Sequence, residues 1–187
     1  PLVLVHVSDT PDVWVWTGDM CPMGPESYQA QWFLDHADRF REVFGEVPVL
    51  VMDGNHDDVD AGPALRHIGV NAIDVSLHPI TVLGKTVVGF PQIPILPMGS
   101  RFEVGPAQLR SLCRSVATAN ADWLVTHAPP SGILSGVDGD DWGIPGLVLP
   151  PATTHHFFGH VHKCRDVVVV DGKTYSNAST GVNLLTI

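Results

Sequence analysis

The hydrophobic and polar positions of this chain fall into blocks that predict alternating strands and helices. Three apolar, β-branched runs near the start are typical of strands buried on both faces, and they span residues 2–7, 12–16 and 48–52. Between the second and third runs, apolar side chains recur at helical spacing from Phe33 to Phe44. We therefore expect one helix there, which begins at Pro25-Glu26 and ends at Gly45.

The rest of the chain is richer in β pattern. Residues 72–90 alternate between apolar and polar positions and predict two strands around a turn at 83–86, whereas residues 109–116 predict a second amphipathic helix. Further strands are expected over 123–125, 157–158, 167–170 and 182–187, with Asp171-Gly172 as a hairpin turn. Residues 128–151 are rich in Gly, Pro and Asp and too long for a plain connector, which is typical of a functional loop.

The order of these elements indicates the fold class. Strands and helices alternate in the first half and strands dominate the second, which predicts an α/β sandwich with ligands at the carboxyl ends of its strands. A length of 187 residues lies within the usual range of one domain. Because the pattern shows no internal repeat and no linker, we expect a single domain over residues 1–187.

The charge balance restricts the partners that the chain can bind. The formal net charge is −10, and the 10 lysine and arginine residues never cluster into a stripe. An extended nucleic-acid surface needs such a cluster, so small phosphate esters suit the chain better than long polyanions. No apolar run approaches the roughly 18 residues that cross a bilayer, and residues 2–7 lack the flanks of a signal peptide. We therefore expect a soluble, cytoplasmic protein with no membrane partner, and we predict no oligomeric state.

Polar clusters follow the predicted strands at five places. These clusters are Ser8-Asp9, Gly18-Asp19, Gly54-Asn55-His56-Asp57, Thr126-His127 and Gly159-His160-Val161-His162. Any one of them alone is more typical of a turn, a helix cap or a packed core histidine. Together, at strand ends that meet at one rim of a sheet, they predict a metal site. Carboxylate, amide and imidazole ligands suit manganese, iron, zinc or nickel better than calcium or magnesium.

At these residues the chain resembles the calcineurin-like metallophosphoesterase family. The family pattern is Asp-x-His, then Gly-Asp, Gly-Asn-His-Asp, a lone His, and Gly-His-x-His. The resemblance implies a two-sheet α/β/β/α sandwich and two divalent metal ions as cofactors, with manganese favoured and iron, zinc or nickel as alternatives. It also implies the ligand set: Asp19 bridges both ions, Asp9 and His162 hold the first, and Asn55, His127 and His160 hold the second.

The resemblance gives the remaining two polar residues of the third cluster a catalytic role. His56 is expected to face the substrate phosphate, and Asp57 is expected to orient His56. Adjacent residues after a strand project in different directions, so Asn55 and His56 are not expected to serve the same metal. We therefore assign His56 to the substrate and Asn55 to the ion.

The first motif departs from the family pattern. Where Asp-x-His is expected, the chain reads Asp9-Thr10-Pro11, and proline cannot bind a metal. The same place separates two predicted buried strands by only four residues, although parallel strands need a crossover of a dozen or more. We hypothesise that a segment carrying the expected histidine is missing between Thr10 and Pro11.

Weaker candidates surround these motifs. His155 and His156 are expected to pack within a strand, and Cys21 could lie at the rim of the site. Trp142, in the long loop, could stack a base or could only pin the loop. Asn177 lies in a segment that resembles the family segment supporting the last metal motif.

The function that follows is hydrolysis of small phosphate esters. A diester, such as a cyclic or other small nucleotide, is preferred over a monoester or a phosphoprotein, and the reaction uses a metal-activated water. The alternative is a non-catalytic scaffold with a decayed metal site, which the absent histidine of the first motif would favour.

Overall fold

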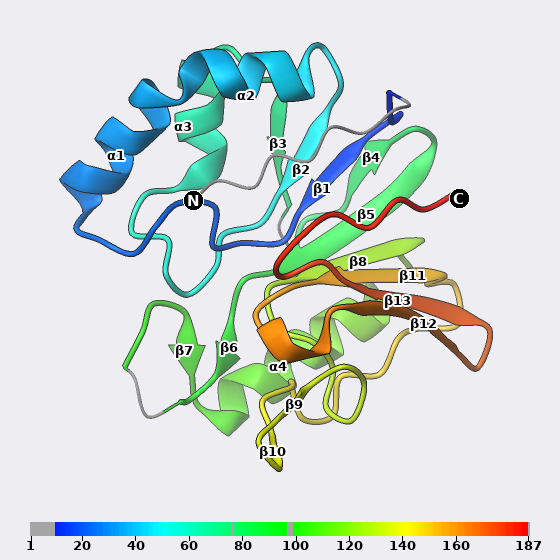
Figure 1. The fold of residues 1–187 in the computed structure, drawn as a ribbon. Helices are drawn as coiled ribbons and strands as arrows, with labels where there is room; N and C mark the ends of the chain where they lie inside the picture. Colours follow the sequence, from blue (N-terminus) through cyan, green and yellow to red (C-terminus); the bar gives the residue numbers. More distant parts are fainter. Residues whose placement is uncertain (1–9, 76, 97–98, 187) are drawn as a thin grey trace.

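The computed structural model describes residues 10–75, 77–96 and 99–186, which form a mixed α/β fold (Figure 1). The smaller of its two main sheets is entirely parallel. Its strands, in spatial order, are β1 (Trp14–Trp16), β2 (Val49–Val51) and β3 (Ala72–Asp74). Since β1 and β2 are parallel, the chain between them crosses over through two helices. The strand expected over residues 2–7 lies outside the described residues, and so does Asp9.

The larger sheet has six strands in the order β12-β13-β11-β8-β5-β4. Their bounds are β4 Ile80–Val82, β5 Lys85–Phe90, β8 Trp123–Thr126, β11 His155–Phe158, β12 Asp166–Val170 and β13 Lys173–Asn177. The four central strands are parallel, and an antiparallel strand closes each edge. Two short sheets add to these: β6 (Ile93–Pro94) with β7 (Glu103–Val104), and β9 (Gly136–Val137) with β10 (Asp140–Asp141).

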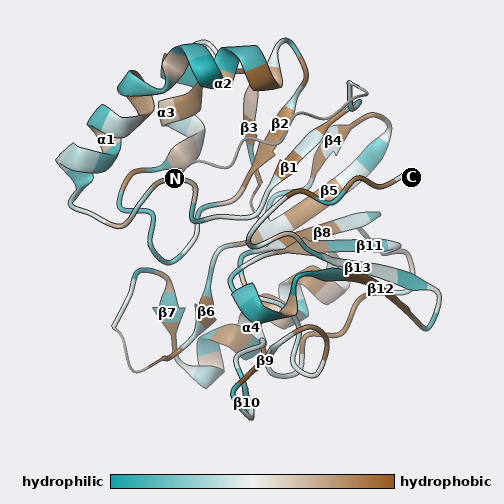
Figure 2. Ribbon diagram, viewed as in Figure 1, coloured by the Kyte–Doolittle hydropathy of each residue, from teal (hydrophilic) through white to brown (hydrophobic). Residues whose placement is uncertain are grey.

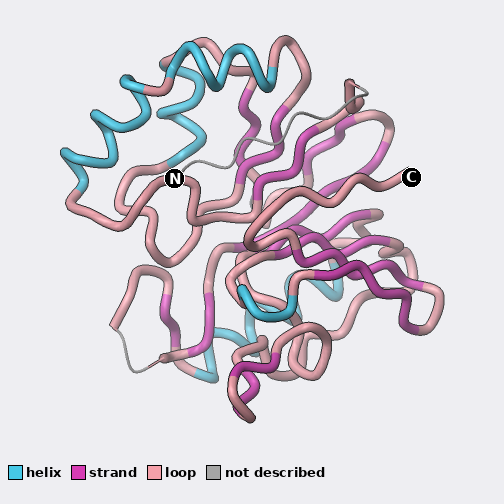
Figure 3. The backbone as a smooth tube through the Cα atoms, in the orientation of Figure 1, coloured by secondary structure: helices cyan, strands magenta, loops and turns pink. Residues whose placement is uncertain are grey.

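Three hydrophobic cores fill the spaces between the helices and the two sheets. Helices α1 (Glu26–Asp35), α2 (Ala37–Phe44) and α3 (Ala61–His67) cover the three-stranded sheet through a core that includes Phe33 and Phe40. A second core joins the two sheets, with Leu50 from one and Val125 from the other. Helix α4 (Pro106–Thr118) packs on the far face of the larger sheet. Figure 2 shows apolar residues along β2 and β3, and Figure 3 shows the helices on the outside of the two sheets.

The prediction of an α/β fold is confirmed, with corrections to individual elements. The single helix expected up to Gly45 is two helices, because the chain bends at His36, whose φ is −107° and ψ 9°. Helix α3 was not predicted, since seven residues that include Gly62 and Pro63 carry too little helical pattern. No helix among the described residues is long and apolar enough to cross a bilayer.

The strand expected over residues 182–187 is wrong, because the described part of that segment, residues 182–186, forms no strand. The Asp171-Gly172 turn forms as predicted, but the strand that returns from it is β13, directly after the turn. Its sequence, Lys-Thr-Tyr-Ser-Asn, is mostly polar, yet Tyr175, Ser176 and Asn177 are buried between β11 and β12. Burial from both neighbouring strands therefore outweighs the low apolar content of this segment.

The polar clusters meet where the carboxyl ends of the two sheets face each other. Residues 17–19 follow β1 and residues 52–57 follow β2, both in the smaller sheet. His127 follows β8 and residues 159–160 follow β11, both in the larger sheet. The candidate site is therefore built across the junction of the two sheets.

Candidate metal centre

Four of the predicted ligands converge on one point. Ligand atoms of Asp19, His127 and His160 all lie within 4.8 Å of one another. Asn55 completes the group, because its Oδ1 lies 2.9 Å from His127 Nε2 and 3.0 Å from His160 Nδ1. Asn55 and His127 are fully buried, whereas Asp19 and His160 are half-buried. One carboxylate, one amide oxygen and two imidazoles thus face a common centre.

A contact with the smaller sheet determines which ring nitrogen of His127 carries the proton. His127 Nδ1 lies 2.7 Å from the carbonyl oxygen of Thr17, which can only accept, so Nδ1 carries the proton and donates. The other nitrogen, Nε2, therefore turns its free position toward Asn55 Oδ1 and toward Asp19 Oδ2 at 3.4 Å. Three atoms that can all accept meet here, and only a proton or a cation between them makes the arrangement favourable.

The close approach of these groups shifts their pKa values. Burial alone would raise the pKa of Asp19, but the hydrogen bond and charge of His127 outweigh it and lower the pKa to about 2. Burial alone would lower the pKa of His127, and Asp19 reverses this and raises it. For His160, burial lowers the pKa to about 3, so its imidazole is neutral. His160 and Asp19 are therefore in the protonation states that metal ligation requires, whereas His127 would give up any shared proton to an ion.

The backbone at the centre is strained and closely packed. Asp19 and His160 both have left-handed φ angles, 54° and 63°, which non-glycine residues adopt rarely. Gly54 admits no side chain, because a Cβ there would lie 2.7 Å from His127 Cε1 and closer still to Asp19. Gly18 approaches the Gly54 backbone in the same way. The Gly-Asp and Gly-Asn pairs therefore bring two loops into contact, and the strained residues are those that point into the centre.

Asp57 does not orient His56, which corrects the expectation from the sequence. Its carboxylate accepts from the backbone N–H groups of Asp19 at 2.7 Å, Gly54 at 2.8 Å and Met20 at 3.0 Å. Burial raises the pKa of Asp57, and the N–H groups of Gly54 and Asp19 oppose that rise. With both oxygens used by backbone groups, Asp57 joins the loops after β1 and β2.

His56 is held through its backbone. Its N–H donates to Asp19 Oδ1 at 3.0 Å, and its carbonyl accepts from Gln29 Nε2 at 2.7 Å. The imidazole is half-buried, and Nε2 lies 3.4 Å from Asn55 Nδ2. The ends of the Asn55 and His56 side chains therefore lie close together, contrary to the expected divergence, and Asn55 turns its oxygen toward His127 and His160.

Gln29 on α1 is a buried support that the sequence pattern did not single out. Its Nε2 donates to the carbonyls of His56 and Pro22, and its Oε1 accepts from the N–H groups of Asp58 and Val59 at 2.6 and 3.1 Å. Every hydrogen-bonding position of this amide is used. The only sequence signal is a polar residue on the inner face of a helix, next to Trp32 and Phe33.

The two remaining predicted ligands, Asp9 and His162, are not part of the converging group that the structure describes. His162 lies in the short 3-10 helix η1 (His162–Cys164), and its side chain is exposed and outside the converging group. Asp9 lies outside the described residues. The ligands expected for the first ion therefore remain a prediction, and so does the hypothesis of a missing segment after Thr10.

Several weaker expectations fall near the centre. The Trp142 ring lies 6.0 Å from the His160 ring, so the long loop borders the site. Asn177 supports the last motif as expected, because its Nδ2 donates to the Val161 carbonyl at 2.9 Å.

His156 is packed in the core against Phe158, as expected for a strand histidine. Burial raises the pKa of the Cys21 thiol to about 12, so it is not a reactive thiol.

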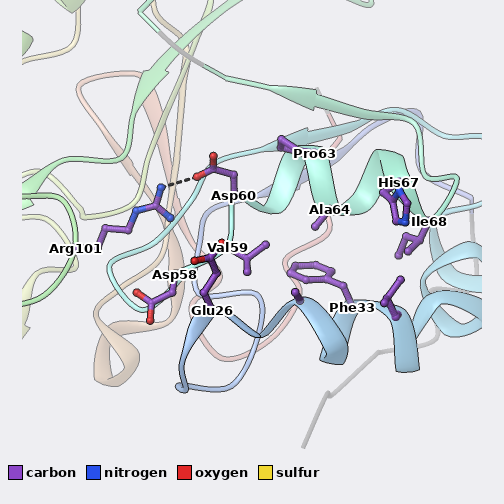
Figure 4. Close-up of a pocket in the computed structure, with 12 residues that line it drawn as sticks. Glu26, Phe33, Asp58, Val59, Asp60, Pro63, Ala64, His67, Ile68 and Arg101 are labelled. Atoms are coloured by element: carbon purple, nitrogen blue, oxygen red, sulfur yellow. Dashed lines mark hydrogen bonds and ion pairs between the residues drawn. The ribbon is translucent and has the colours of Figure 1, made fainter. Parts of the chain in front are cut away.

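A separate groove of about 510 Å³ lies between α1 and α3 (Figure 4). Phe33 and Ala64 lie on its floor, and Asp58, Asp60 and Arg101 lie at one end, where Arg101 pairs with Asp60. None of the converging ligands lines it. The candidate metal centre is therefore a different place from this groove.

Comparison with known proteins agrees with the geometry. A model of the family described as calcineurin-like phosphoesterase matches residues 3–164, so the chain belongs to this family. The Caenorhabditis elegans UPF0046 protein K07C11.7 is 27% identical over 151 residues, which cover 70% of this chain and 51% of that protein. The chain thus spans about half the length of this relative. A crystal structure with a TM-score of 0.55 and 14% identity covers 90% of this chain and 80% of its own, which shows the shared fold.

Family membership supports a metal-dependent phosphoric ester hydrolase at the general level, and the family usually binds divalent metal ions. The residues fit such an ion. His160 Nε2 is buried without a hydrogen-bond partner, while His160 Nδ1 lies 3.0 Å from Asn55 Oδ1, within the group that Asp19 and His127 complete. Buried polar atoms are rarely left unpaired in this way unless something binds them.

Proposed function

We propose that this chain is a dinuclear metal-dependent phosphoesterase that hydrolyses small phosphate esters, with diesters preferred. The observation that supports the proposal is the convergence of Asp19, His127 and His160 within 4.8 Å, with Asn55 Oδ1 between the imidazoles. These side chains come from four loops of two sheets. No packing need accounts for a buried carboxylate, an amide oxygen and two imidazoles at a single point.

The ligands divide as the family pattern implies. Asn55, His127 and His160 would hold one ion with Asp19, and Asp9 and His162 would hold the other with the same Asp19 carboxylate. Manganese is the metal we favour, with iron, zinc or nickel as alternatives, because oxygen and imidazole donors are mixed. When bound, a pair of divalent ions supplies a water of lowered pKa and stabilises the charge of the phosphoryl oxygens.

His56 would act on the substrate instead of the ion. Its main chain is fixed by Asp19 on one side and Gln29 on the other, while the imidazole remains half-buried beside Asn55. A histidine in this place can donate a proton to the departing oxygen of the ester. Because its backbone is already fixed, His56 loses less conformational entropy when it contacts the substrate.

Two features favour a small diester, such as a cyclic or other small nucleotide, as the substrate. The net charge of −10 disfavours a long polyanion. Trp142 lies beside His160 and is half-buried, and we propose that it stacks a base or another planar group of the substrate.

One observation favours a second candidate, a non-catalytic scaffold of the same fold. The first motif reads Asp9-Thr10-Pro11, without the histidine that the family pattern has there. A chain that truly lacks this ligand would hold the first ion weakly. Such a scaffold would bind a metal at the second site without hydrolysing esters.

An assay with bis(4-nitrophenyl) phosphate and 4-nitrophenyl phosphate, with and without Mn²⁺, separates the two candidates. We expect Mn²⁺-dependent hydrolysis that is faster with the diester. His160→Ala should abolish it, and the matched control His67→Ala, an exposed histidine at the end of α3, should not. Binding of Mn²⁺ without any turnover would support the scaffold.

A further inference from the structure

We propose that Ser100 and Glu103 are positioning residues that fix which end of the Asn55 amide faces the metal site. The inference rests on the proposed function, since it concerns how a ligand to the second ion is held. Asparagine can ligate a cation only through Oδ1, and a half-turn of the amide would present the donor Nδ2 in its place. Something must therefore prevent that half-turn.

The restraint begins at Glu103. Its Oε1 accepts from Ser100 Oγ and from Ser100 N, both at 2.7 Å, and its Oε2 accepts from Leu96 N at 3.2 Å. These hydrogen bonds, the one from the Ser100 hydroxyl foremost, lower the pKa of Glu103. An ionised carboxylate has no proton to give, so the Ser100 hydroxyl must be the donor. Its single proton is thereby committed to Glu103.

With that proton committed, Ser100 Oγ faces Asn55 as an acceptor. Asn55 Nδ2 lies 3.1 Å from it and donates, whereas a flipped amide would bring two acceptor oxygens together. At the other end, Oδ1 lies between His127 Nε2 and His160 Nδ1. The Ser100 end therefore selects this orientation without any metal, and the Oδ1 end selects the same orientation once a cation lies between the acceptors.

The short sheet β6-β7 gives this restraint its place in the fold. Glu103 is in β7, and its partner Leu96 lies just past β6, so the pairing of these strands sets the carboxylate against the loop that carries Ser100. Arg101 anchors the same loop to the Asn55 loop, because its guanidinium donates to the Asp57 carbonyl at 2.5 Å. A small sheet outside the main layers thus acts on the metal centre through residues 100–103.

Titration of Mn²⁺ into the chain by calorimetry tests the inference. We expect Ser100→Ala and Glu103→Gln to weaken Mn²⁺ binding by about 10- to 100-fold, as loss of a hydrogen-bonding partner of a metal ligand typically does. Ser100→Thr keeps the hydroxyl and should bind like the wild type. Ser115→Ala is the matched control, because the Ser115 hydroxyl is exposed on α4 and bonds only the Ser111 carbonyl.

A second background separates positioning from a general structural effect. Asn55→Asp has two equivalent oxygens, so there is no end to select, and adding Ser100→Ala should change its Mn²⁺ affinity by less than about threefold. Equal losses in the two backgrounds, or wild-type binding by Ser100→Ala, would overturn the inference. Absence of Mn²⁺ binding by the wild type would instead overturn the proposed function together with it.

Discussion

His127 Nδ1 donates to the carbonyl oxygen of Thr17 across 2.7 Å, and this bond joins the ends of strands from two different sheets. Thr17 follows β1 in the smaller sheet, and His127 follows β8 in the larger one. The bond leaves Nε2 directed at Asn55 and Asp19. The packing of the two sheets therefore sets the direction of the imidazole before any ion binds, which lowers the reorganisation that binding requires.

The first prediction concerns Asp19. Asp19→Asn should lower turnover by at least about two orders of magnitude and weaken metal binding, because a neutral amide cannot replace a carboxylate shared by two cations. The fold should survive: asparagine tolerates the left-handed φ of 54°, and its oxygen can still accept from the His56 N–H. Turnover and bound metal per chain are the measurements. Wild-type turnover by the variant would exclude the bridging role.

The second prediction concerns His56 and depends on the leaving group. General acid catalysis is worth typically 10²–10⁴-fold, and it matters most when the departing oxygen is a poor leaving group. His56→Ala should therefore lose most of that factor with a nucleoside diester and much less with a nitrophenyl ester. Metal content should stay near that of the wild type. Equal losses of kcat with both substrates would indicate phosphate positioning in place of proton donation.

The third prediction concerns Gln29, whose amide binds four backbone groups around His56. Gln29→Leu leaves these part-buried groups without partners, and we expect the free energy of unfolding to fall by about 1–3 kcal/mol. Displacement of His56 should also reduce kcat. The control is Gln31→Leu, since Gln31 is exposed on the same helix and bonds only Asp35. Urea unfolding that shows the same stability for both variants would contradict this account.

The fourth prediction concerns pH. Burial lowers the pKa of His156 from 6.5 to about 3, so below pH 6.5 the unfolded chain takes up a proton that the folded chain does not. The stability that His156 contributes is therefore full above pH 6.5 and is lost as the pH falls toward 3. Between about pH 7 and pH 5, this group should cost about 2 kcal/mol of unfolding free energy.

Replacement of the histidine should remove that loss. In His156→Leu the Thr126 hydroxyl still donates to the Ala128 carbonyl at 2.6 Å, so no new unpaired donor arises. Urea unfolding of the metal-free chain at both pH values measures the effect. If the variant lost as much stability on acidification as the wild type, another group would be responsible.

The sequence indicated the centre better than it indicated its supports. Loops that follow parallel strands meet at the carboxyl edge of a sheet, so the approach of Asn55 to His127 could be expected from strand ends, although the directions of the Asn55 and His56 side chains could not. Ser100 and Gln29 carry no such signal. Ser100 lies in a proline-rich loop without periodicity, and its contact with Asn55 joins residues 45 positions apart. Contacts of this kind depend on how separate elements pack.

Two of the mistaken expectations concern what a polar segment or side chain does when it is buried. Asp57 was expected to orient a side chain, but buried backbone N–H groups need acceptors, and those of Asp19 and Gly54 use its oxygens. The last strand was placed over apolar residues 182–187, whereas the polar segment β13 took the buried position directly after the turn. Asp57 satisfies buried backbone N–H groups, and β13 is buried by pairing with β11 and β12 on both sides.

The most direct measurement for the central claim is anomalous X-ray diffraction from crystals of the chain grown with Mn²⁺. The account predicts an anomalous peak among Asp19, Asn55, His127 and His160, with donor atoms at about 2.0 to 2.3 Å. The peak should be absent in His160→Ala crystals grown in the same way. A fully occupied Mn²⁺ found elsewhere, with these four side chains still bonded to one another, would contradict it.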